Sequence, residues 1–401
     1  MRQGRMAGGE GPRTDDEGWL GPDQAGRPFR AQIWERRRWL LAVLTLAILL
    51  AGSFVFVLPK SVHPASLSSP IGAPVAYVHM ADVQTGWAQV VDDLFRTTDG
   101  GRHWSRVTPP GQPILAQAAP AAFLNGTVAW VAQLGYSGSI GSETFVILRT
   151  QDGGRHWVPG MPVTVTTPAV LLDLYFLDLQ HGWMLFSQSD VDTSHLGEIA
   201  LYQTADGGAH WSLVLNGPGG APNLGLCSLP ILTFVSPEHG WMTADCTTDV
   251  AALWETTDGG QTWNVGALPG ASHCGCWQPP VILPDRNGVL PAKIGNWMYV
   301  TGDGGETWSA RQLPTDAAIV SDFIDADNGW VALQTTSALY RTTNGGRQWT
   351  ALSSDLRLNK LWELDFIDTR NGWALGQAIE GGPGILYKTA DGGVHWVKVR
   401  V

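Results

Sequence analysis

The sequence predicts an all-β fold, a seven-bladed β-propeller of four-stranded blades, preceded by one N-terminal transmembrane helix. Three observations predict it: a phrase recurs seven times, six times as T-x-D-G-G-x-x-W and once with Asn in place of Asp, an apolar phrase ending in Gly-Trp precedes most copies, and one uncharged 20-residue run lies near the N-terminus. Charged residues make up only 15% of the 401 residues, and glycine occurs 49 times. This composition is typical of turn-rich β structure and disfavours a coiled coil.

The N-terminal part is predicted to anchor the protein in a cell membrane. Residues 1–38 are polar and lack apolar periodicity, which indicates a disordered tail. Trp39–Leu58 contains no charge and is long enough to cross roughly 30 Å of hydrocarbon as a helix. Arginines precede this run and only Lys60 closely follows it, so the positive-inside rule places the tail in the cytoplasm and the remainder outside. Residues 59–74, rich in Ser and Pro, are interpreted as a stalk.

A cleaved signal peptide is the alternative for this segment. Signal peptides usually carry an apolar run of about 7–15 residues followed by a small-residue cleavage site. Trp39–Leu58 is longer than that, and no A-x-A site follows it. We therefore expect an uncleaved, single-pass anchor.

Seven repeats fill residues 75–401. The distance between successive box tryptophans varies from 41 to 54 residues. The acidic or amide position and the final Trp of each box are Asp99 and Trp104, Asp152 and Trp157, Asp206 and Trp211, Asp258 and Trp263, Asp303 and Trp308, Asn344 and Trp349, and Asp391 and Trp396. Units of about 40–50 residues with four short strands are typical of a propeller. A solenoid is the rival architecture, but open arrays need polar capping repeats and this sequence has none.

A second phrase, F-x-D-x-x-x-G-W, begins most units. Phe366, Asp368 and Gly372-Trp373 show it in the seventh unit, whereas the fifth unit has Gly288-Val289 where Gly-Trp is expected. We expect blade one to start near Val75 and blade seven to end at Val401, so that the ring closes without strand exchange.

Turn chemistry accounts for the box. An Asp carboxylate accepts nearby backbone N–H groups, paired glycines reach positive φ, and the Thr hydroxyl locks the turn. The Trp is expected to cover apolar surface between blades. Box histidines fall at the same turn position in different blades, so the ring separates them and no metal site or other cofactor is predicted. They are His103, His156, His210 and His395.

The box resembles the Asp-box, or bacterial neuraminidase repeat, and the added F-x-D-x-x-x-G-W phrase is similar to that of the photosystem II assembly and stability factor family. That resemblance covers about residues 75–401 and implies a lumenal seven-bladed propeller that helps to assemble a membrane complex. It therefore implies a protein partner, a non-catalytic scaffold role and no catalytic residues. The net charge of −11 disfavours nucleic acid.

Enzymes share the Asp-box, so the alternative function is a glycoside hydrolase, sialidase-like or another exo-glycosidase, with a carbohydrate ligand. Sialidases add an F-R-I-P phrase, which is missing here. Glycosidases need two carboxyls at a defined separation, and the sequence singles out no such pair among its 36 acids.

The predicted binding face carries the irregular loops. Connections 2–3 and 4–1 of each blade lie on the face opposite the boxes, and irregular loops on a rigid scaffold commonly bind partners. The candidate binding residues on these loops are Tyr136, Asp190, Asp192, His195, Glu198 and Trp277. Trp277 is either an exposed recognition aromatic or a packed residue.

All four cysteines lie around the fourth repeat: Cys227, Cys246, Cys274 and Cys276. An even number outside the cytoplasm favours disulfides, although three pairings are possible. A zinc site with His273 and free thiols are the alternatives.

Overall fold

The computed structural model describes residues 75–111, 121–135, 141–166, 169–187, 199–216, 227–246, 253–266, 268–269, 277–283, 285–293 and 295–401. The predicted tail, membrane helix and stalk lie outside these ranges. Within them, no helix has the length and apolarity to span a membrane.

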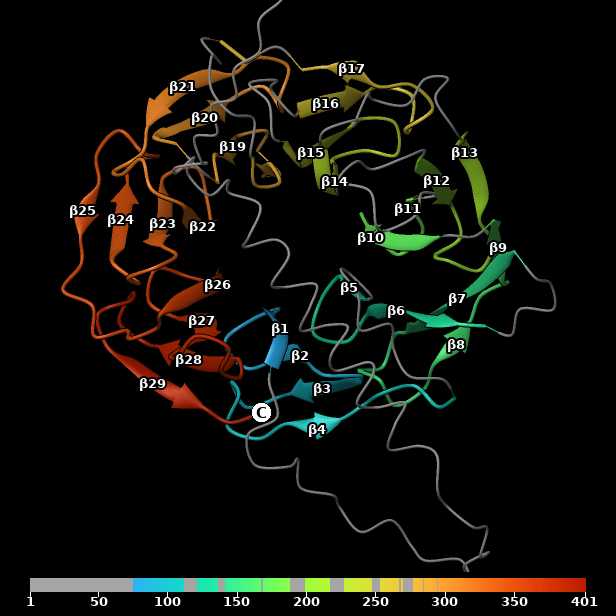
Figure 1. Ribbon diagram of the computed structural model, residues 1–401, viewed down its shortest axis with the longest axis horizontal. Helices are drawn as coiled ribbons and strands as arrows, with labels where there is room; N and C mark the ends of the chain where they lie inside the picture. The colour runs from blue at the N-terminus through green and yellow to red at the C-terminus, as the bar shows by residue number, and fades with distance from the viewer. Residues whose placement is uncertain are drawn as a thin grey trace, which may run out of the picture. The chain divides into compact units, whose positions relative to one another are not determined.

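Seven antiparallel sheets surround a common axis, as the sequence predicts (Figure 1). In the first three blades the strands are β1 (Val75–Met80), β2 (Gly86–Val90), β3 (Asp93–Thr97) and β4 (Ser105–Arg106); β5 (Ala121–Phe123), β6 (Ala129–Leu134), β7 (Ser142–Thr150), β8 (Val158–Pro159) and β9 (Val163–Thr166); and β10 (Val170–Phe176), β11 (Gly182–Ser187), β12 (Ile199–Thr204) and β13 (Ser212–Asn216).

In blades four to seven they are β14 (Cys227–Phe234), β15 (Gly240–Cys246), β16 (Leu253–Thr256) and β17 (Asn264–Val265); β18 (Val281–Ile282), β19 (Gly288–Pro291), β20 (Trp297–Thr301) and β21 (Ser309–Gln312); β22 (Ile319–Phe323), β23 (Asn328–Leu333), β24 (Leu339–Thr343) and β25 (Thr350–Ala351); and β26 (Lys360–Phe366), β27 (Gly372–Gln377), β28 (Ile385–Thr389) and β29 (Trp396–Val399). The first strand of each blade lies innermost and the last outermost (Figure 1).

The ring closes without strand exchange. Strands β26 to β29 form one sheet and β1 to β4 another, so each blade owns its strands. Blade two departs from the four-strand pattern, because β9 also pairs with β7. Strand β7 has nine residues and β8 pairs with only two of them near its end, which leaves the other half of β7 free to take a fifth strand.

Each Asp-box holds its turn through the Thr and the Asp, as blade three illustrates. The Thr204 hydroxyl donates to Asp206 Oδ1 at 2.9 Å, and the same oxygen accepts the His210 backbone N–H at 2.9 Å. The Gly208 N–H donates to Thr204 Oγ1 at 2.9 Å, with φ of Gly208 at 90°. The Asp206 carboxylate thus stabilises the turn through these hydrogen bonds. These hydrogen bonds hold the pKa of Asp206 at about 2, although burial opposes them.

A joint between blades six and seven shows the contacts that recur, in whole or in part, at most blade boundaries. Trp330 on β23 is fully buried, stacks on Phe366 of blade seven at 3.8 Å between ring centroids, and donates its indole N–H to the Gly392 carbonyl at 3.0 Å. Arg341 on β24 lies opposite Trp330 and covers its ring at 5.1 Å. This joint therefore combines an aromatic stack, an interblade hydrogen bond and a cation over the indole.

Most blade boundaries repeat parts of this joint. Indole N–H groups cross to the next blade in the pairs Trp87 to Asn125, Trp130 to Gly207 and Trp183 to Gly259. Cations cover the rings of Trp87, Trp130 and Trp373 from Arg96, Arg149 and Lys388. At the closing boundary, Lys388 Nζ donates to the Gly100 carbonyl at 2.9 Å, which ties blade seven to blade one.

Candidate functional site

Four carboxyls lie between neighbouring inner strands, and we call them the inner-strand carboxyls: Asp173, Asp322, Glu363 and Asp365. Asp173 on β10 accepts the Leu232 N–H of β14 at 2.7 Å. Asp365 on β26 accepts the Met80 N–H of β1 at 2.6 Å. Asp322 accepts the Phe366 N–H and Glu363 accepts the Val78 N–H. Each of the four carboxyls thus accepts a backbone N–H from the following blade.

Packing between the inner strands makes these carboxyls weak acids, although only Asp173 is buried and the other three are half-buried. Burial raises the pKa of Asp173, Asp322 and Asp365 to about 7, against the accepted N–H bonds, which lower it. Burial, followed by the charge of Asp365, raises the pKa of Glu363 well above its usual range. Near neutral pH these groups therefore hold protons that ordinary carboxyls have lost.

Aromatic side chains of β1 adjoin the carboxyls. Tyr77 and His79 point to the same side of the strand, and both stack on Phe123, at 5.8 Å and 5.9 Å between ring centroids. Desolvation, followed by the charges of Glu363 and Asp365, raises the pKa of Tyr77 well above its usual range. Burial lowers the pKa of His79 to about 4, so this imidazole is neutral at pH 7.

This arrangement permits two kinds of chemistry. A protonated carboxyl near neutral pH can act as a general acid, and a Tyr beside carboxyls is a possible nucleophile. The same carboxyls also fasten adjacent blades, since each accepts an N–H that would otherwise be buried without a partner. Within the described ranges, no group of three or more His, Cys, Asp or Glu side chains is arranged to hold a metal ion.

Most of the sequence-predicted binding residues lie outside the described ranges: Tyr136, Asp190, Asp192, His195 and Glu198. Trp277 is described and is only 5% exposed. Its ring meets Tyr299 edge-on at 5.3 Å, and a bridge links it to Ala292. The exposed-recognition interpretation of Trp277 is therefore wrong. Trp277 is packed against the sheet of blade five, whereas the cysteines that the packing alternative would have it cap, Cys274 and Cys276, lie outside the described residues.

The structure describes the backbone of two of the four cysteines, Cys227 and Cys246. Cys274 and Cys276 lie outside the described residues. The backbone register of β14 and β15 sets Cys227 directly opposite Cys246.

Sequence reasoning missed the inner-strand carboxyls. A signal for them exists, since Asp322 and Asp365 come directly before the Phe that opens the second phrase, in first strands that alternate apolar and polar residues. An acid in such a run is costly unless it finds a partner, which marks it as a residue with a specific role.

Part of the repeat region matches a known protein family. Residues 303–401 match the family model described as "Photosynthesis system II assembly factor YCF48". The sequence resemblance to that family is thus confirmed for these residues, which run from the box of blade five to the C-terminus. No curated protein sequence matches the chain.

Three solved structures are similar to this chain. "YCF48 bound to D1 peptide" is 18% identical, with 82% of each chain covered and a TM-score of 0.46. YCF48 from Cyanidioschyzon merolae is 19% identical, over 74% of this chain and 89% of that one, with a TM-score of 0.48. The GH74 enzyme of Niastella koreensis is 15% identical, over 81% of this chain and 54% of that one, with a TM-score of 0.55. At such identities the likeness concerns the fold alone.

Proposed function

We propose that this protein is a membrane-anchored, non-catalytic scaffold whose propeller binds a protein partner outside the cytoplasm, as a photosystem II assembly factor does. The observation that carries the proposal is the use of the inner-strand carboxyls. Each accepts a backbone N–H across a blade boundary, so the acids nearest the axis join the ring together. The match of residues 303–401 to the assembly-factor model supports the same role.

The partner site is proposed on the loop face opposite the boxes. Asp190, Asp192, His195 and Glu198 belong to one connection, between β11 and β12 of blade three, and an acidic loop of this kind suits a basic partner segment. A disulfide between Cys227 and Cys246 would fix the shape of this face. Directly opposed residues of an antiparallel pair lie roughly 4.5–5.5 Å apart between Cα atoms, which is within disulfide range.

Affinity purification from membranes tests the scaffold role. The full chain should bring down one particular membrane complex or its precursor, identified by mass spectrometry. Replacing Asp190 and Asp192 with Ala should weaken capture, while Glu306→Ala, a matched acid removal on the box face, should leave it unchanged. If both variants capture the complex as well as the wild type, the loop-face assignment is wrong.

A glycoside hydrolase is the second candidate function. The convergence of Tyr77 with the inner-strand carboxyls favours it, because a carboxyl with a pKa of about 7 can protonate a leaving group at neutral pH. Purified protein should then cleave aryl glycosides, and Asp365→Asn should abolish the activity. Robust hydrolysis of this kind would overturn the non-catalytic proposal.

A further inference from the structure

The boundary between blades five and six lacks the repeated joint. Val289 and Val300 stand at the two positions that carry the Trp and its covering cation in blade six, and they lie opposite each other on β19 and β20. Phe323 of blade six consequently has no indole stacked on it from blade five, although it is positioned as Phe366 is at the next boundary.

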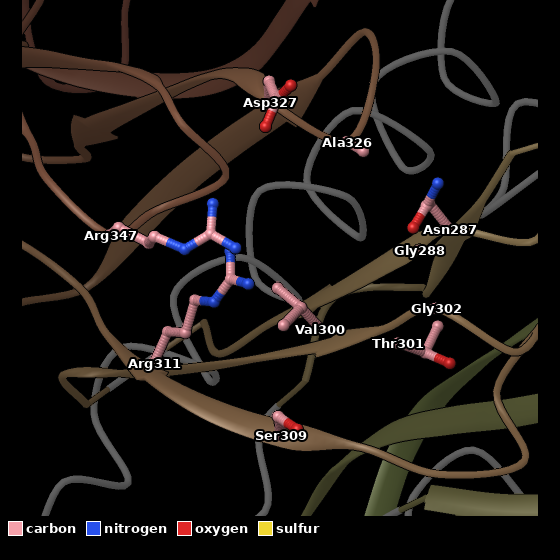
Figure 2. Close-up of a pocket in the computed structure, with 10 residues that line it drawn as sticks. All are labelled: Asn287, Gly288, Val300, Thr301, Gly302, Ser309, Arg311, Ala326, Asp327 and Arg347. Carbon is pink, nitrogen blue, oxygen red and sulfur yellow. The ribbon is translucent and has the colours of Figure 1, made fainter.

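A cavity of about 270 Å³ occupies this boundary on the box face (Figure 2). Its walls include Gly288 and Val300 of blade five and Ala326 and Asp327 of blade six. Val300 lines the cavity at the position where blade six carries a guanidinium, and its smaller side chain leaves space there.

Two arginine side chains of the lining extend toward each other, and their guanidinium groups adjoin in the view of Figure 2. Arg311 comes from β21, and its guanidinium donates to the Gly345 carbonyl, the position that accepts the indole N–H in blades three, four and seven. Arg347 belongs to the box of blade six and makes only a long 3.4 Å contact with the Asn344 carbonyl. Burial, followed by the charge of Arg347, lowers the pKa of Arg311.

Neither guanidinium forms an ion pair with a carboxylate of the described residues. Asp327 also lines the cavity and is drawn apart from both guanidinium groups in Figure 2. Other acids nearby are already engaged, since Glu306 pairs with Arg286 at 2.8 Å and Asp303 accepts the hydroxyls of its own box. Two cations with one acid in the same lining leave a net positive charge, which favours binding of an anion.

We propose that this cavity is a binding site for a single carboxylate group, held by Arg347 and Arg311. A guanidinium fork matches the two oxygens of a carboxylate. With Asp327 in the wall, the lining carries two cations and one anion, which balances a monoanion and disfavours a phosphate dianion. The Ser309 hydroxyl, also in the lining, adds a neutral donor. The site lies on the box face and is independent of the loop-face partner site.

The carboxylate can come from a free small molecule or from a protein side chain, and titrations of the full-length protein distinguish these sources. The probes are acetate, inorganic phosphate and the blocked peptide acetyl-Gly-Ser-Glu-Ser-Gly-amide, each followed by ligand-observed NMR at constant ionic strength. We expect acetate or the peptide to bind with a dissociation constant of about 1 mM and phosphate to bind more weakly. Binding of the peptide alone assigns the site to a protein carboxylate, and binding of acetate alone assigns it to a free one.

Matched variants separate the cavity from general surface charge. Arg347→Ala should weaken binding about tenfold or more, the usual loss for a charge-assisted hydrogen bond. Arg155→Ala removes the cation at the same box position in blade two, where Trp87 and Arg96 fill the preceding boundary, and should change nothing. Val289→Trp restores the repeat residue, can reach Phe323 and the Gly345 carbonyl, and should abolish binding.

Three results would overturn the proposal: no binding of acetate or peptide, tighter binding of phosphate, or equal losses in Arg347→Ala and Arg155→Ala. If Val289→Trp fails to fold, the two arginine variants still decide the question. Partner capture through the loop face should be unaffected by all of them, so failure here differs from failure of the scaffold role.

Discussion

The interblade joint can be measured by comparing two fully buried tryptophans. Trp330 and Trp373 both have 0% exposure, and each lies under a cation, at 5.1 Å from Arg341 and 4.8 Å from Lys388. Only Trp330 donates an indole hydrogen bond, to Gly392, because the Trp373 Nε1 is buried without a partner. The two rings are thus equally buried, and they differ in the indole hydrogen bond and in the stacking of Trp330 on Phe366, which a Phe at position 330 can keep in part.

Replacing each with Phe should give different losses of stability. Both changes remove part of a buried ring, but Trp330→Phe also leaves the Gly392 carbonyl without its donor, which costs about 1–3 kcal/mol. Trp373→Phe removes an indole N–H that has no acceptor, so no hydrogen bond is lost and the change in unfolding free energy comes from the smaller ring alone. We expect the free energy of unfolding to fall by about 1–3 kcal/mol more for Trp330→Phe than for Trp373→Phe. Trp→Ala at either position should cost about 3–5 kcal/mol.

The assay is urea unfolding at pH 7, followed by both far-UV circular dichroism and tryptophan fluorescence. Coincident transitions justify a two-state free energy, which a ring of this size needs as a check. Equal losses in the two Phe variants, or a larger loss for Trp373→Phe, would refute the argument that the indole hydrogen bond stabilises the blade boundary.

Three further predictions concern the inner strands, the cysteines and the anchor. The pKa of Asp173 is raised to about 7 in the folded protein, so its stabilising contribution is full below its unfolded pKa near 3.8 and is lost as the pH rises through 7. The variant Asp173→Asn does not titrate and can still accept the Leu232 N–H. Urea titrations should therefore show that it loses less stability than the wild type between pH 5 and pH 8. Non-reduced peptide mapping should recover Cys227 linked to Cys246, and a linkage of either one to Cys274 or Cys276 would contradict the register argument. A reporter active only outside the cytoplasm should work when fused after Val401, whereas activity of a cytoplasm-only reporter there would reverse the predicted orientation.

Local sequence determined the blades and their phase. The spacing of the boxes fixes the number of units, and the Thr, Asp and two glycines of each box build the turn through hydrogen bonds within a few residues. Such contacts depend on chain positions that are close together, so a repeated phrase encodes them directly. The start near Val75 and the closure without strand exchange follow from the same phase.

Contacts between blades were decided only by the tertiary structure. Asp365 meets the Met80 N–H across 285 residues of sequence, and nothing in the local pattern around either residue names the other. The burial of Trp277 likewise depends on Tyr299 of the next blade. The missing Trp at Val289 is visible in the sequence, but the cavity that it leaves, and the two arginines that meet there, exist only because the ring places β21 of blade five beside the box of blade six.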